Sequence, residues 1–257
     1  MSIYDHFRAE EAMFVDKALD WKTAAETYHK TKLTDFLDPR EQQIAAAIIG
    51  SYSDAAIQFF GASPQAERKR ALIYPPYLVP EEADFQIDVL EVEYASKFYT
   101  IEHRQVLGAL MSLGVKREKF GDIFIGDEKV QIAVATEVTP YIQMNLQSIG
   151  RAKVSLSVVS PDAVIKTEET WTEKSGTVSS LRLDVLLAEM FRLPRQKSQI
   201  LIKSGLVKVN WKIIEQPSFE CYSGDVLSAR GHGRGKILSI EGKSKRDKWR
   251  IVYGLLK

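Results

Sequence analysis

The order of apolar patterns in residues 85–159 constrains the fold of this chain most strongly. Alternating apolar and polar residues predict β-strands, and apolar residues three or four positions apart predict helices. In order, the patterns predict strand 85–94, helix 103–113, strands 122–125 and 130–135, helix 141–149 and strand 153–159. This βαββαβ succession is typical of the ferredoxin-like arrangement. We therefore expect a ferredoxin-like domain in residues 81–164.

RNA-recognition motifs share this arrangement, but the residues here favour a different use of the sheet. Such motifs stack bases on aromatic side chains of two central strands. The expected third strand, 130–135, contains no aromatic residue, and residues 81–93 are rich in Asp and Glu. A structural or protein-contacting domain is therefore favoured over base stacking on this sheet. The basic stretch 116–119 is more typical of a solvated turn than of a phosphate contact.

The first eighty residues predict a mainly helical domain. Apolar residues recur at helical spacing in 7–28. Asp38, followed by Pro39 and Glu41, has the signature of a capped helix start, and Gly50 can end that helix in a left-handed conformation. The remaining features are strand-like segments at 55–60 and 70–74 and prolines at 75, 76 and 80, which mark the expected end of domain 1–80.

The charge of the chain is divided between two regions. Residues 181–257 contain sixteen Lys and Arg against seven Asp and Glu, a net charge of +9, whereas residues 1–180 carry −8. A basic region of this length is typical of a domain that binds a polyanion, and nucleic acid is the usual partner. The polar stretch 165–180 has little apolar periodicity, so we expect a linker or an exposed ribbon there.

Composition limits the class of protein. A chain of 257 residues with 45% apolar residues is long enough for two or three packed domains. Cys221 is the only cysteine, so no intramolecular disulfide forms, which fits a reducing, cytoplasmic setting. The sequence has no secretory signal and no apolar run near the ~20 residues that cross a bilayer, so we expect no membrane insertion. The expected fold class is α+β.

The basic region 181–257 has the apolar pattern of a small α+β domain. An amphipathic helix is expected from Leu183 to Phe191, and a second from Arg195 to Ser204. The expected strands are 207–210, 212–214, 226–229 and 249–253, with a flexible, glycine-rich basic loop at 230–236.

A string of motifs between Leu181 and Ala229 resembles the S4 RNA-binding domain, which is named after the fourth small-subunit ribosomal protein. The motifs are Arg182-Leu183-Asp184-x-x-Leu187, then Arg195-x-x-x-x-x-x-Ile202-Lys203-x-Gly205-x-Val207-x-Val209-Asn210-x-Lys212, then Gly224-Asp225-Val226. Two positions depart from the family pattern. Pro194 stands where a serine usually caps the second helix, and Trp211 stands where a glycine usually follows Asn210. The tryptophan stiffens the turn and would place an aromatic side chain near the RNA.

Over its whole length the chain resembles the YlmH-like proteins of Gram-positive bacteria. The segments that carry this resemblance are 33–41, 66–71, 117–123 and 230–235. The resemblance implies a non-enzymatic RNA-binding factor that associates with ribosomal RNA of the large subunit and with peptidyl-tRNA. It implies a role in the rescue of stalled translation, that is, in ribosome-associated quality control. It also implies a link to cell-division proteins, because some relatives lie near cell-division genes.

The basic residues that would contact RNA lie in the S4-like region. Arg182 and Arg195 each open an expected helix, where free N–H groups and the helix dipole favour phosphate. An arginine there adds bidentate donors. The other expected contacts are Lys197, Lys203, Lys208, Lys212, Arg230 and Arg234. The glycines at 231, 233 and 235 would allow close backbone approach, whereas the basic stretch 243–248 is more typical of a solvated turn.

We expect no catalytic, cofactor or metal site. The four histidines do not lie at ligand spacing from Cys221, and neither a P-loop nor a Gly-x-Ser-x-Gly motif occurs. The Arg182-Leu183-Asp184 triplet is like one in pseudouridine synthases, but no such catalytic domain surrounds it, and Asp184 is expected to be a helix-start acid. Two alternatives stay open: an RNA-modifying enzyme with its site in residues 1–164, and a cell-division interaction factor with secondary RNA binding.

Overall fold

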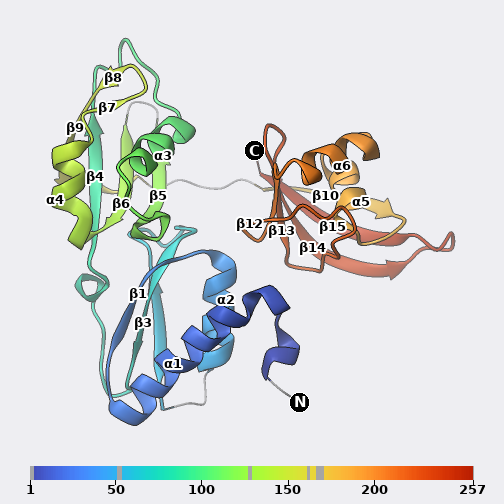
Figure 1. Ribbon diagram of the computed structural model, residues 1–257, viewed down its shortest axis with the longest axis horizontal. Coiled ribbons are helices and arrows are strands. Elements are labelled where there is room, and N and C mark those ends of the chain that lie inside the picture. The colour runs from blue at the N-terminus through green and yellow to red at the C-terminus, as the bar shows by residue number, and fades with distance from the viewer. Residues whose placement is uncertain (1–2, 51–53, 127–128, 161–162, 166–170, 257) are drawn as a thin grey trace. The chain divides into compact units, whose positions relative to one another are not determined.

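The computed structural model describes residues 3–50, 54–126, 129–160, 163–165 and 171–256. It consists of two compact units, Met1–Thr167 and Glu168–Lys257 (Figure 1). Both units combine helices with sheets, which confirms the expected α+β class.

The first half of the N-terminal unit packs two helices on a three-stranded antiparallel sheet (Figure 1). The elements are α1 (Ala12–Tyr28), β1 (Lys32–Leu37), α2 (Pro39–Ile49), β2 (Ala56–Phe60) and β3 (Lys69–Tyr74), with sheet order β1-β3-β2. The prediction of a mainly helical domain is therefore incomplete. It missed β1 because this strand breaks alternation, with Thr34 and then both Phe36 and Leu37 buried.

Helix α2 begins as its sequence predicts. Asp38 accepts a hydrogen bond from the Glu41 N–H at 2.9 Å, and the Glu41 carboxylate accepts one from the Asp38 N–H at 2.9 Å. Pro39 occupies the first turn, where a missing N–H costs nothing. Gly50 ends the helix with φ +68° and ψ 172°, so its φ is positive but its conformation is not the left-handed helical one that we expected.

The second half of this unit is the predicted βαββαβ domain. Its elements are β4 (Ile87–Glu93), α3 (His103–Ser112), β5 (Phe120–Ile125), β6 (Val130–Ala135), α4 (Thr139–Asn145) and β9 (Ser155–Val159). The antiparallel sheet has the order β5-β6-β4-β9, which is the ferredoxin-like order. The core beneath the helices contains Leu90, Leu110, Phe120, Ile132 and Ile142.

The second expected helix of this domain is shorter than predicted. It ends at Asn145, and the residues after it form a small hairpin of β7 (Ser148–Ile149) and β8 (Ala152–Lys153). Gly150 lies in the turn of that hairpin with φ +59°, so it does not cap the helix. The apolar residues Leu146 and Ile149 fit a helical spacing in sequence, but both reach the core from a non-helical backbone.

The two halves of the N-terminal unit are joined by hydrogen bonds that are buried or partly buried. The Arg68 guanidinium donates to the Phe120 carbonyl of the second half at 3.2 Å, and to the Phe36 carbonyl of its own half at 2.7 Å. Asp122 accepts from the backbone N–H groups of Glu67 and Arg68 at 2.5 and 3.1 Å. Burial raises the pKa of Asp122 above its ordinary value, although these two donors act in the opposite direction. The first eighty residues and the βαββαβ domain therefore share one body.

The C-terminal unit packs two helices on one face of a six-stranded antiparallel sheet (Figure 1). The helices are α5 (Leu183–Met190) and α6 (Arg195–Lys203). The strands are β10 (Trp171–Val178), β11 (Val207–Val209), β12 (Lys212–Ile213), β13 (Val226–Ala229), β14 (Gly233–Lys243) and β15 (Trp249–Leu256), in the order β10-β15-β14-β13-β11-β12. The core between helices and sheet includes Leu186, Leu187, Ile202, Leu227 and Ile237.

Two segments of this unit correct the sequence prediction. Segment 165–180 was expected to be a linker or an exposed ribbon, and Trp171–Val178 is an edge strand that pairs with β15 along its whole length and places Val178 in the core. Residues 166–170 lie outside the described part. In the expected loop 230–236, residues from Gly233 onward belong to β14 and pair with β13. Both segments are polar or rich in glycine, so their apolar content did not indicate strands.

Candidate RNA interface

A buried carboxylate connects the two helix starts of the C-terminal unit. The Asp184 side chain is 0% exposed. It accepts hydrogen bonds from the Arg182 Nε at 3.1 Å and the Arg195 Nε at 3.0 Å. A third donor, Gln199 Nε2, lies 2.8 Å from the same carboxylate. Asp184 is therefore more than a helix-start acid, because it holds both arginines in fixed orientations.

The two arginines remain accessible despite this bonding. The side chain of Arg182 is 41% exposed and that of Arg195 is 53% exposed. Burial by itself would raise the pKa of Asp184, but the hydrogen bonds from Gln199, Arg182 and Arg195 hold the pKa below its ordinary value. The carboxylate is thus charged at neutral pH, and the guanidinium N–H groups that do not bond it are donors suited to an anionic ligand.

The other predicted lysines lie on several elements of the unit. Lys197 lies exposed on the first turn of α6, and Lys203, also exposed, is the last residue of that helix. Lys208 and Arg230 line one shallow cleft of about 220 Å³, together with Gly205. Lys212 pairs with Val209 and so belongs to the helix side of the sheet, opposite to Lys208.

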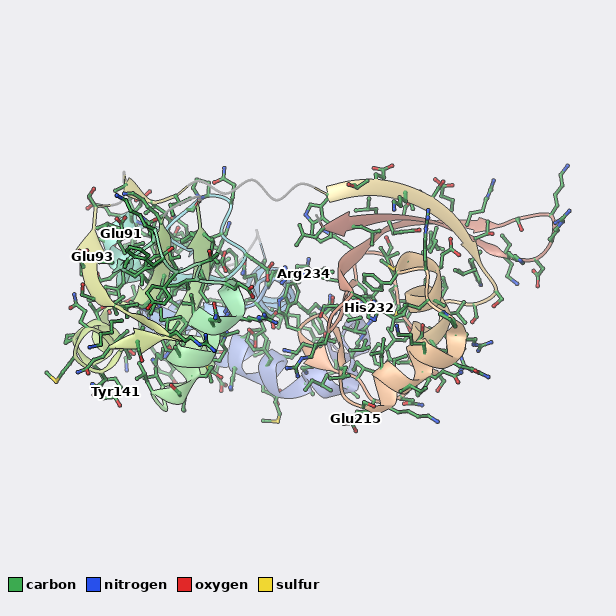
Figure 2. The ribbon with its side chains drawn as sticks, turned by 90° about the horizontal axis from the view of Figure 1, so that it is seen from above. Glu91, Glu93, Tyr141, Glu215, His232 and Arg234 are labelled. Atoms are coloured by element: carbon green, nitrogen blue, oxygen red, sulfur yellow. The ribbon has the colours of Figure 1, made fainter. Side chains whose placement is uncertain are left out.

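Arg234 lies on β14 beside an aromatic ring. Its guanidinium carbon is 5.9 Å from the centroid of the Trp211 ring, a cation–π distance. His232 is in the turn that precedes β14, and both side chains are labelled in Figure 2. The sequence indicated the basic residues, but their grouping into an Asp184 cluster, a cleft and an arginine–tryptophan pair depends on the fold.

The glycines before and within β14 have structural roles. Gly231 and Gly233 have φ of +82° and +105°, which favours glycine in this turn. A Cβ at Gly235 would lie 2.5 Å from the Met190 methyl group, so this glycine permits packing of α5 on the sheet. Turn geometry and core packing therefore account for these glycines, and close approach of RNA to their backbone stays a prediction.

A buried polar pair fixes the turn between β11 and β12. Asn210 donates to the Asp225 carboxylate at 2.7 Å and accepts from the Val226 N–H at 2.9 Å. Asp225 also accepts from the Tyr222 N–H at 2.8 Å. Both motif residues that the sequence indicated, Asn210 and Asp225, thus stabilise the backbone that carries Trp211.

The βαββαβ domain does not present an open aromatic sheet face. Phe36 and Val164 pack with Val89 and Ala133 on the face away from the helices. Gln131 is fully buried there, and its amide bonds the backbone of Ala163 and Ile165 at 2.9 and 2.8 Å. All six residues of β6 are buried.

Acidic residues mark the neighbouring strand of this sheet. Glu91 and Glu93 lie close together on β4 (Figure 2). The hydrogen bond from Gln131 and, to a lesser extent, contacts from Lys129 lower the pKa of Glu91, so this group is charged. A face covered by the chain itself and rimmed by carboxylates is unsuited to base stacking.

Metal-binding clusters and membrane-spanning helices are absent from the residues that the structure describes. Among them, no group of three or more His, Cys, Asp or Glu could hold a metal ion. Within the same residues, no helix combines the length and apolar character needed to cross a bilayer. Clefts larger than the one beside Lys208 occur in the N-terminal unit, and the one lined by all of β1 mixes cations such as Arg70 and Lys119 with carboxylates such as Asp35 and Glu137.

The sequence matches three described families in order along the chain. Residues 10–78 match the YlmH N-terminal domain, residues 80–162 match the putative RNA-binding domain in YlmH, and residues 181–227 match the S4 domain. The S4 match ends before β14 and β15, and it begins after β10.

Two relatives are similar over large parts of the chain. The ribosome-associated protein quality control protein P2 of Bacillus subtilis (strain 168) is 47% identical over 251 residues, which cover 98% of this chain and 97% of that protein. A solved structure, the cell division protein ylmH from Streptococcus pneumoniae, is 32% identical with a TM-score of 0.55 and covers 64% of this chain and 100% of its own. By its sequence and its order of domains, the chain belongs to the YlmH family.

Proposed function

We propose that this protein is a non-enzymatic RNA-binding factor that associates with the large ribosomal subunit and tRNA during the rescue of stalled translation. The observation that carries this proposal is the Asp184 cluster, in which one buried carboxylate orients two exposed arginines. Phosphate oxygens match the fork of an arginine, and oriented arginines lose less entropy on binding. Supporting this, a 47% identical relative is named as a ribosome-associated quality control protein.

The charge distribution supports the C-terminal unit as the RNA anchor. Residues 168–257 contain seventeen Lys and Arg against ten Asp and Glu, whereas residues 1–167 have a net charge of −6. The proposed contacts are the arginines of the Asp184 cluster with Lys197, Lys203, Lys208, Lys212, Arg230 and Arg234. The N-terminal unit would then position the protein or recruit partners in the cytoplasm.

Sedimentation through sucrose tests this proposal. The tagged full-length protein is expected to migrate with large subunits, and the associated RNA to include tRNA. The informative variant is Lys197→Ala combined with Arg230→Ala, because both residues are exposed and neither contributes to the Asp184 cluster. We expect this double variant to dissociate at lower salt than wild type. If the wild-type protein stays at the top of the sucrose gradient even at low salt, the proposal is refuted.

A cell-division role is the second candidate, and one observation favours it. The solved relative is named as a cell division protein. In that case the N-terminal unit would carry the interaction, and septal localisation would survive loss of the basic contacts.

The RNA-modifying alternative places a catalytic site in residues 1–164 and is tested by mapping modified nucleotides in a deletion strain. An unchanged modification pattern excludes that alternative.

A further inference from the structure

The sheet of the C-terminal unit has a second face, and its residues follow from strand register. Directly paired residues in an antiparallel sheet point to the same side. Lys208 pairs with Ser228, and Ser228 pairs with Arg234. The residues next to them in sequence, such as Val209, Leu227 and Gly235, face the other side of the sheet and are buried against the helices. Lys208, Ser228 and Arg234 therefore lie in one row on the face away from α5 and α6, which we call the outer face.

The outer face continues across the strands that lie beyond the S4 match. Lys236 is two residues after Arg234 and pairs with Gly254, so it is on the same side. Gly254 pairs with Glu173 of β10. The Trp171 ring lies over Gly254, where an added Cβ would be 3.2 Å from it.

The charge of the outer face is complementary to a polyanion. Its strand positions carry Lys208, Arg234, Lys236 and Arg250 against two carboxylates, Glu173 and, by alternation from Ser239, Glu241. Ser228 and Lys236 are half-buried and Lys208 is exposed, so these groups reach solvent. A basic surface with aromatic residues is typical of proteins that bind unpaired nucleotides.

Trp211 stands at the edge of this face in an unfavourable backbone conformation. Asn210 and Trp211 have φ of +48° and +66°. Two consecutive positive φ values define the tight turn that prefers Asn followed by Gly. A bulky aromatic residue in this region is an outlier, and such strain persists where a residue has a role beyond folding. The Asn210–Asp225 pair holds the turn, so the backbone that carries the ring is held in place before any ligand arrives.

We propose that the outer face binds unpaired RNA nucleotides. One base stacks on Trp211, and the neighbouring phosphates of the RNA contact Lys208, Arg234 and Lys236. The proposal deepens the proposed function and rests on it, because it assigns a second contact surface to the same RNA-binding unit. Arg234 already lies over the Trp211 ring at a cation–π distance. A base stacked next to this pair would gain from both the ring and the guanidinium group. The Asp184 cluster would contact phosphates irrespective of whether their bases are paired.

The test compares two RNA probes with the full-length protein. One is a hairpin with an unpaired loop, and the other is the same stem as a blunt duplex without the loop. The key variant is Trp211→Gly, which restores the preferred turn residue and removes the stacking surface. Stacking is worth roughly 1–3 kcal/mol per base, so the affinity for the hairpin should fall about tenfold. The affinity for the duplex should not change.

Two further variants separate stacking from folding. Trp211→Phe keeps an aromatic face and should retain most of the hairpin affinity. Thermal melting of Trp211→Gly should be unchanged or improved, because its turn is relaxed. Tryptophan fluorescence should be quenched by the hairpin in wild type, and this quenching should be smaller in Trp211→Gly.

The outcomes distinguish this inference from the proposed function. If wild type binds the hairpin, and Trp211→Gly binds it equally well with the same quenching, the inference is overturned and the RNA anchor stands. If wild type binds neither probe nor ribosomes, the proposed function itself fails. A loss of hairpin affinity that Trp211→Phe does not rescue would also overturn stacking as the reason.

Discussion

The most informative residue in this chain is Asp184, because its burial couples folding to the proposed RNA contacts. A charge buried with three donors becomes costly when one donor is removed. We expect Arg195→Ala to destabilise the C-terminal unit by about 1–3 kcal/mol in addition to weakening RNA binding. Denaturant unfolding measures the first effect. The matched control is Lys197→Ala, which removes a charge from the same helix turn and should change stability by about 0.5 kcal/mol or less. Equal stability of both variants would contradict the cluster.

Asp184 also predicts how stability depends on pH. Its pKa is lower in the folded protein than the ordinary value of 3.8. The unfolded chain therefore binds more protons between the two values, and the stability that Asp184 contributes is present above pH 4 and is lost as pH falls through the folded pKa. Thermal melting of the C-terminal fragment from pH 7 to pH 3 should show this loss. The Asp184→Asn variant should be less stable than wild type at pH 7, and its stability should fall less than that of wild type on acidification. An identical dependence of melting temperature on pH in the two proteins would argue against this role of Asp184.

Helix α6 also contains a buried polar group that lacks a hydrogen-bond partner. Ser198 is fully buried, and its hydroxyl has no hydrogen-bond partner among the described residues. Burying an unpaired hydroxyl costs roughly 1–3 kcal/mol. Ser198→Ala removes that group with little change of volume, so the unfolding free energy should be unchanged or higher. A marked loss of stability would mean that the hydroxyl has a partner, such as an ordered water.

At the scale of elements, β10 shows why the C-terminal module begins earlier than its sequence motifs. Trp171–Val178 covers the edge of β15 and pairs with it at eight positions. Without β10, the backbone groups on that edge of β15 would be unpaired, and an exposed edge favours association with other chains. A fragment of residues 181–257 should therefore be less stable and more prone to aggregate than one of residues 168–257. Thermal melting and light scattering compare the two, and equal behaviour would count against this view.

The same elements show what the sequence could predict. Periodicity and capping located α2, α5, α6 and the βαββαβ order, because each has a local apolar pattern or an end signal. Strand β10 was missed because it is largely polar and pairs with β15, which is distant in sequence. The start of β14 was missed because it lies in a glycine-rich basic stretch. The eight basic residues were singled out by composition and motif, and their contact with RNA stays a prediction. Their arrangement could not be predicted, because burial of Asp184 and the outer-face register exist only after folding.

At the scale of the whole molecule, the two units should differ in RNA binding. Residues 168–257 have a net charge of +7, and residues 1–167 have −6. Counterion release makes phosphate contacts sensitive to salt, and a protein with several of them loses on the order of a thousandfold in affinity between 50 and 200 mM salt. We expect the fragment 168–257 to bind structured RNA with this steep dependence. Residues 1–167 should bind weakly at any salt, because the unit is acidic and chain residues cover its central sheet. Gel shifts at several salt concentrations measure both fragments. Tight binding by residues 1–167 alone would move the RNA contact to the βαββαβ domain and refute the C-terminal unit as the anchor.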